Sequence, residues 1–144
     1  MSAPLYNAEI LRLATSIPHL GRLEHADGSA ELRSPVCGSR VIVDVRSEGD
    51  RIGGIGLEVH SCALGQASAC LLARHAPGLT LGQLEDGVKN LAALLKGETA
   101  NTDFWPGIEA LARAKNYPAR HPAILLPFDA AVAAMRSAMT KVGG

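Results

Sequence analysis

The chain has 144 residues, 47% of them hydrophobic, which fits one domain able to bury about two thirds of its unfolded surface. Its 14 basic and 14 acidic side chains balance, so no net positive charge favours binding to nucleic acid or to an anionic membrane. The three cysteines are an odd number, and we find neither an export signal nor an apolar run of bilayer length, so we expect a cytoplasmic protein with reduced thiols.

The first predicted element is a helix from about Pro4 to Ser16, because apolar residues recur on one side and Pro18 follows. The segment Ser29 to Arg33 is predicted to be a short strand. Pro35 follows that strand and limits it to a sheet edge or a strand end, because proline cannot donate a hydrogen bond.

A β-hairpin is predicted next, around the turn Ser47-Glu48-Gly49-Asp50. Both flanks alternate apolar with polar or small residues, as half-buried antiparallel strands do. Pairing across this turn places Cys37 opposite His60, with Cys62 two residues farther on, an offset of about 7 Å that a bulge at Gly53-Gly54 could close. The pattern therefore predicts that two thiols meet at one end of the hairpin. The apolar positions of the two strands are Val41, Val43, Val45, Ile55, Leu57 and Val59.

Helices are predicted for most of the remaining chain. Ser61 is expected to cap a helix from Cys62 to about Ala76, and the Thr80-Leu81-Gly82-Gln83 spacing predicts a capping box at the start of a second helix. That second helix carries an apolar stripe and ends at Gly97.

The C-terminal part is predicted to contain a short helix within Phe104 to Lys115, an extended segment from Tyr117 to Pro122, and a final helix from Asp129 to Lys141. Pro127 leaves the start of that last helix open, since proline is disfavoured inside helices.

The thiols and imidazoles are the candidate ligands for a metal or sulfur site. A thiolate at Cys62 would be stabilised by the helix N-terminus, whereas a cysteine at such a position can also be a simple core residue. Cys70 lies about 12 Å farther along the same helix and is interpreted as a core residue. His60 is expected on the same face as Cys62, and His121 could reach the thiols from the predicted extended segment.

Several short motifs together resemble the NifU/IscU-type iron-sulfur cluster assembly scaffold family, especially its SufU-like branch. Ser34-Pro35-Val36-Cys37-Gly38 is similar to the family's Asn-Pro-x-Cys-Gly-Asp motif, and Cys62 with Gln66-Ala67-Ser68-Ala69 is similar to its second cysteine and the helix that follows. Tyr6-Asn7, Pro18 to Gly21 and Tyr117 to Arg120 resemble further family segments, and the resemblance extends from about Leu5 to Met135.

The resemblance implies a SufE/NifU-like α+β fold, in which a three-stranded antiparallel sheet packs against about five helices in a single domain over residues 1–144. Family members use three cysteines and an aspartate to assemble a [2Fe-2S] cluster or to bind zinc. Ser39 stands at the aspartate position and Ala123 at the third cysteine position, so zinc is disfavoured here. The motif by which one branch binds a chaperone is absent from residues 117–121.

Three hypotheses about function follow. The leading one is a scaffold, rather than an enzyme, that binds iron, a [2Fe-2S] cluster or transferred sulfur through Cys37 and Cys62. Its ligand set would be completed by a second chain in a homodimer, by external thiols or by His121. The alternatives are a sulfurtransferase-like persulfide acceptor for a cysteine desulfurase and a degenerate member that docks partners without cluster chemistry. The partners implied are a cysteine desulfurase and recipient apo-proteins.

Overall fold

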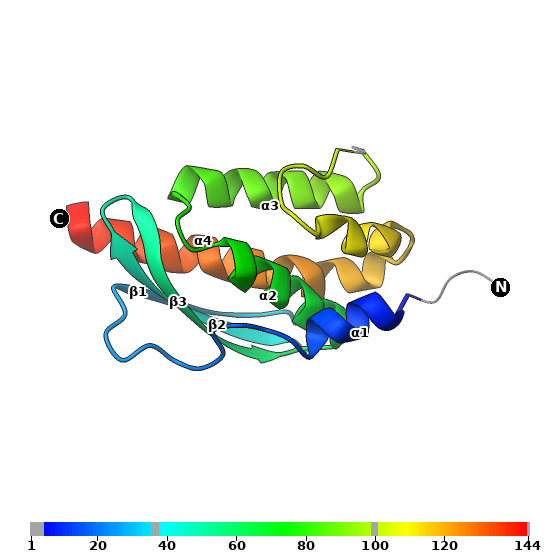
Figure 1. The fold of residues 1–144 in the computed structure, drawn as a ribbon, viewed down its shortest axis with the longest axis horizontal. Coiled ribbons are helices and arrows are strands. Elements are labelled where there is room, and N and C mark those ends of the chain that lie inside the picture. Colours follow the sequence, from blue (N-terminus) through cyan, green and yellow to red (C-terminus); the bar gives the residue numbers. More distant parts are fainter. Residues whose placement is uncertain (1–4, 36–37, 99–100, 144) are drawn as a thin grey trace.

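The computed structural model describes residues 5–35, 38–98 and 101–143, and this part of the chain forms an α+β fold with one sheet (Figure 1). The three strands are antiparallel and follow the order β1-β2-β3. The predicted fold class is therefore confirmed. In chain order the elements are α1 (Ala8–Ala14), β1 (Gly28–Arg33), β2 (Arg40–Glu48), β3 (Arg51–His60), α2 (Ala63–His75), α3 (Leu81–Leu95), the 3-10 helices η1 (Ile108–Asn116) and η2 (Pro118–Arg120), and α4 (His121–Gly143).

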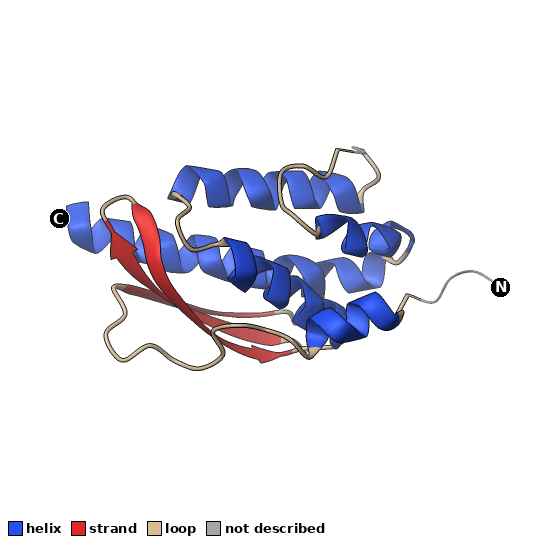
Figure 2. Ribbon diagram, viewed as in Figure 1, coloured by secondary structure: helices blue, strands red, loops and turns tan. Residues whose placement is uncertain are grey.

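The helices gather on one face of the sheet (Figure 2). Helix α4 packs across β1 and β2, α2 packs against α1 and α4 and contacts β3, and α3 lies farther from the sheet, on α4 and η1. The alternation predicted for the hairpin is confirmed, because the strand residues facing the helices are buried in the core. These buried strand residues are Val41, Val43, Val45, Ile52, Ile55 and Leu57.

The hairpin register differs from the prediction. The turn consists of Gly49 and Asp50 alone, with Gly49 in the left-handed region at a φ of 63°, and His60 pairs with Arg40. The predicted pairing of His60 with Cys37 is therefore wrong, because the turn lies farther along the chain and β3 carries an extra residue. That extra residue is Gly53, where the register shifts, so the predicted bulge is confirmed.

The segment between α1 and β1 lies against the sheet on the side of β3 and the face away from the helices. The Gly21 amide donates to the Leu57 carbonyl, and the Leu57 amide donates to the His19 carbonyl, so this segment pairs with β3. Gly56 lies directly beneath it, since a Cβ at Gly56 would come within 2.5 Å of the Gly21 carbonyl oxygen. Close approach at this point requires glycine in the strand.

Asp44 anchors the same segment to β2. Its carboxylate is buried and accepts four hydrogen bonds: two from the Arg22 guanidinium, one from the Leu23 amide and one from the Ser29 hydroxyl. Burial alone would raise the pKa of this carboxyl group, but the hydrogen bonds and the charge of Arg22 outweigh it and the pKa is lowered.

The two helices after the hairpin match the sequence prediction closely. Helix α2 begins at Ala63, one residue later than predicted, and its N-cap is Cys62 instead of Ser61. Helix α3 has the predicted capping box. The Thr80 hydroxyl accepts a hydrogen bond from the Gln83 backbone amide, and the Gln83 side-chain oxygen accepts one from the Thr80 backbone amide. The N-terminal helix α1 is shorter than predicted and starts after Asn7, whose side chain accepts from the Ile10 amide.

The C-terminal region departs most from the prediction. The predicted short helix is present as η1, but the segment predicted to be extended forms η2 and the first turn of α4. Helix α4 begins eight residues before the predicted start, because Pro127 lies inside the helix instead of before it. Close to this proline, the Ser68 hydroxyl of α2 donates a hydrogen bond to the Ile124 carbonyl at 2.5 Å.

Helix α4 is long and apolar enough to cross a membrane by length and composition alone. However, 61% of its apolar window is buried inside the protein, where it packs on the sheet and on α2. Its hydrophobic character is therefore explained by its position as a core helix.

Candidate functional site

A hollow of about 510 Å³ lies where β2 begins, β3 ends and helices α2 and α4 start. In Figure 1 these segments lie at the end of the molecule where α1 also lies. The hollow combines apolar walls with several polar side chains. The lining residues are Gly38, Ser39, Val59, His60, Ser61, Cys62, Gln66, Ala119, Arg120 and Ala123.

Cys62 is a partly exposed free thiol at the N-cap of α2. Its backbone is extended, and its side chain makes no capping hydrogen bond to the helix. The thiol therefore stays available to the hollow while the unpaired amides of the first helical turn lie next to it. This is the helix N-terminus at which the sequence predicted a stabilised thiolate.

Tyr6 and Arg120 share the surroundings of Cys62. Burial raises the pKa of the Tyr6 phenol, and the Cys62 sulfur raises it further by its charge and by a hydrogen bond. Arg120 acts in the opposite direction and lowers that pKa by its positive charge. The Tyr6 phenol is thus influenced by both the Cys62 sulfur and the Arg120 guanidinium.

Two hydroxyl groups form the floor of the hollow next to Cys62. The Ser39 and Ser61 oxygens lie 3.0 Å apart and are hydrogen-bonded, and Ser39 is buried. This arrangement needs glycine at position 65, because a Cβ there would lie 1.9 Å from the Ser61 oxygen. Ser61 therefore stabilises the contact between the hairpin and α2 instead of capping the helix as predicted.

Ala123 closes the hollow from the side of α4 and is buried at 2% exposure. Ser39, Cys62 and Ala123 come from three separate parts of the chain, yet all three line the same hollow. By the sequence resemblance, family members carry ligands at these three positions, and the structure brings the three positions together.

The fourth such position, Cys37, lies outside the described residues, and its role stays a prediction. Gly38 and Ser39, which follow it in the chain, line the hollow. Gly38 has a φ of 73°, its amide donates to the Ser34 carbonyl, and the Ser34 amide donates to the Ser39 carbonyl.

The histidines predicted near the thiols lie in different places. His60, the last residue of β3, is exposed and lines the hollow together with Cys62. His121 is not among the lining residues, and its Nε2 lies 2.7 Å from the Ala114 carbonyl oxygen. A hydrogen bond donated from Nε2 leaves only Nδ1 free for a metal, so ligation by His121 stays a prediction that would use that nitrogen.

Cys70 is fully buried in α2, as expected for a core residue. Its sulfur lies 3.6 Å from the Ser16 carbonyl oxygen and accepts from Arg74, and burial raises the pKa of its thiol. It takes no part in the hollow.

Among the described residues, the donor set of the hollow is too small to enclose a metal ion. In the described part of the chain, no group of three or more His, Cys, Asp or Glu side chains could hold one. Cys62 and His60 supply one sulfur and one imidazole nitrogen, which leaves open coordination positions for any bound metal.

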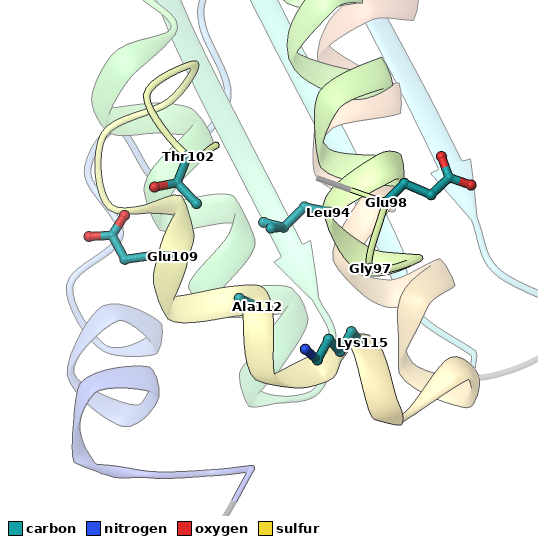
Figure 3. Close-up of a pocket in the computed structure, with 7 residues that line it drawn as sticks. All are labelled: Leu94, Gly97, Glu98, Thr102, Glu109, Ala112 and Lys115. Carbon is teal, nitrogen blue, oxygen red and sulfur yellow. The ribbon is translucent and has the colours of Figure 1, made fainter. Parts of the chain in front are cut away.

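A second hollow of about 470 Å³ between α3 and η1 offers no comparable chemistry. No thiol or imidazole lines it, and Figure 3 shows Glu98 and Glu109 on opposite sides, so their carboxylates do not converge.

The sequence motifs pointed to no role for Tyr6, Gln66 or Arg120 in the site. These residues come from the segment before α1, from the first turn of α2 and from η2. No short motif joins these segments, and their proximity depends on the packing of α1 and α4 around α2.

The chain matches no protein-family model and no curated protein sequence. Solved structures are more informative. A nitrogen-fixing NifU-like protein (N-terminal) from Brucella abortus superposes with a TM-score of 0.89 and 31% sequence identity over 95% of this chain and 96% of that one. A protein from Fervidobacterium islandicum, described as an iron-sulfur cluster assembly scaffold protein for the SUF system, gives 0.85 and 26% over 91% and 96%.

Proposed function

The chain belongs to the NifU-like family of iron-sulfur cluster assembly scaffold proteins, and we propose that it carries iron, sulfur or a [2Fe-2S] cluster as cargo on Cys37 and Cys62. The observation that carries this proposal is the hollow itself, where Cys62 lies with Ser39 and Ala123 at three of the family's four ligand positions. Thiolates are the ligands that iron-sulfur clusters use in proteins.

The two replaced positions define how this chain would differ from a scaffold with a full ligand set. Neither the Ala123 methyl group nor the hydrogen-bonded Ser39 hydroxyl supplies a thiolate or a carboxylate. One chain therefore offers two thiolates, and the remaining ligands come from a second chain, from small thiols or from the Nδ1 of His121. Because the chain alone does not supply all the ligands, the bound iron, sulfur or cluster can be transferred to another protein.

We place the protein in the cytoplasm, between a cysteine desulfurase that supplies sulfur and apo-proteins that receive the cluster. The fold supports this position in general, since the neighbour from Fervidobacterium islandicum is described as a scaffold for cluster assembly. The partly exposed Cys62 thiol at a helix N-terminus is suited to accept sulfur from a partner.

Anaerobic reconstitution with iron and sulfide tests the proposed function. We expect wild-type protein to bind both elements and to develop charge-transfer absorption, and Cys62→Ser to lose most of this. Ala123→Cys adds a thiol at the wall of the hollow and is expected to bind more iron per chain than wild type.

Cys70→Ser is the matched control, because it removes a cysteine from the same helix without touching the hollow. Wild-type protein that binds no iron or sulfide, or Cys62→Ser that binds as much as wild type, would contradict the proposal.

A further inference from the structure

The hollow contains polar groups that the cargo ligands do not use. Arg120 and Gln66 line it beside Cys62, and Arg120 forms no ion pair among the described residues. A guanidinium at the rim of a hollow can accept a carboxylate through two parallel hydrogen bonds.

Arg120 and Cys62 line the same hollow, Arg120 from η2 and Cys62 from the N-cap of α2. A small molecule bound in this hollow can therefore contact both groups.

Space is available between these two groups. Ala119 and Ala123 present only methyl groups, and the hollow of about 510 Å³ lies within the range of sites that hold small molecules. A side chain larger than alanine at position 123 would fill part of it.

We propose that this hollow binds a small aliphatic thiol that carries a carboxylate, or the corresponding disulfide, with the carboxylate on Arg120 and the sulfur next to Cys62. In the thiol form the molecule supplies the sulfur ligand that Ala123 does not, which rests on the proposed function. Recognition of the molecule by Arg120 does not rest on it and can be tested without iron.

The test is thiol-disulfide exchange on the metal-free protein. The Cys62 thiolate attacks one sulfur of a symmetric disulfide, a new sulfur-sulfur bond forms at Cys62, and the other half leaves as a thiolate, so no further oxidant is needed. The probes are dithiodipropionate, hydroxyethyl disulfide and cystamine, which differ in carrying negative, neutral or positive ends. Mass spectrometry of the peptide that contains Cys62 gives each rate.

We expect the ratio of the rates with the anionic and the neutral disulfide to fall about fivefold in Arg120→Gln, the upper range for an exposed ion pair. The same ratio for cystamine over the neutral disulfide should rise or stay constant. A ratio cancels any change in the reactivity of the thiol itself. Arg113→Gln, which removes an exposed arginine from η1 outside the hollow, should leave both ratios unchanged.

An anionic-to-neutral ratio that is the same in wild type and Arg120→Gln would overturn the inference. Because the exchange assay contains no iron or sulfide, its failure is separate from failure of the reconstitution. Selectivity in exchange without iron binding would remove the proposed function and leave this binding site in place.

Discussion

Ser39 and Ala123 line the hollow at positions where, by the sequence resemblance, family members carry ligands. Both residues are buried, and Ser39 is hydrogen-bonded to Ser61, so they fit the local packing. Motif positions in the sequence pointed to Cys62, Ser39 and Ala123, but no sequence pattern pointed to Tyr6 or Arg120. Their place near Cys62 follows from three-dimensional packing that neither residue type nor spacing encodes.

The lowered pKa of Asp44 predicts how the free energy of unfolding depends on pH. Its pKa is lowered in the folded protein, so the stabilisation it provides is complete above the pKa of an unfolded aspartate, about 3.9, and is lost as the pH falls through the lower folded value. We expect Asp44→Asn to reduce the free energy of unfolding by about 1–3 kcal/mol near neutral pH, because buried donors lose their ionised acceptor.

Urea unfolding of wild type and Asp44→Asn at a series of pH values measures this. The difference between the two proteins should shrink in acid. Asp50→Asn, at the exposed hairpin turn, is the control and should change stability little at any pH. A difference for Asp44→Asn that stays constant down to the lowest pH would show that its charge does not contribute.

At the scale of the elements, local signals predicted structure well and long-range ones did not. The capping box at Thr80 and the apolar alternation of the hairpin are complete within a few residues, and both are confirmed. The predicted strand register was wrong because the two-residue turn and the extra residue at Gly53 both shift the pairing of β3 with β2. The predicted start of α4 was wrong because the helix contains Pro127, and proline is disfavoured inside helices.

Gly65 lets α2 pack closely against the end of the hairpin, so a larger residue there should weaken this contact. A methyl group there would collide with the Ser61 side chain and approach the Ala123 carbonyl oxygen at 3.2 Å. We expect Gly65→Ala to break the contact between Ser39 and Ser61 and to lower the free energy of unfolding by about 1–3 kcal/mol.

Gly82→Ala in α3 is the matched control, because the nearest atom to its added Cβ, on Thr80, is 3.9 Å away. This change should be neutral or stabilise the protein by up to about 1 kcal/mol, as glycine is a poor helix former. Chemical denaturation compares the two variants, and a Gly65→Ala protein as stable as Gly82→Ala would contradict the packing described for α2.

In the whole molecule, the hollow lies at one end of the sheet, where segments far apart in the sequence meet. The end of the hairpin, the start of α2 and the segment from η2 to α4 meet there, and α1 lies beside them (Figure 1). The rest of the protein forms a continuous core around α2 and α4.

The iron content of protein purified without oxygen tests whether the hollow at Cys62 holds iron or a cluster in the cell. Wild-type protein is predicted to carry iron, Cys62→Ser to carry much less, and Cys70→Ser to match wild type. Wild-type protein that is free of iron when isolated in this way, or Cys62→Ser protein that carries as much iron as wild type, would show that the hollow does not hold it.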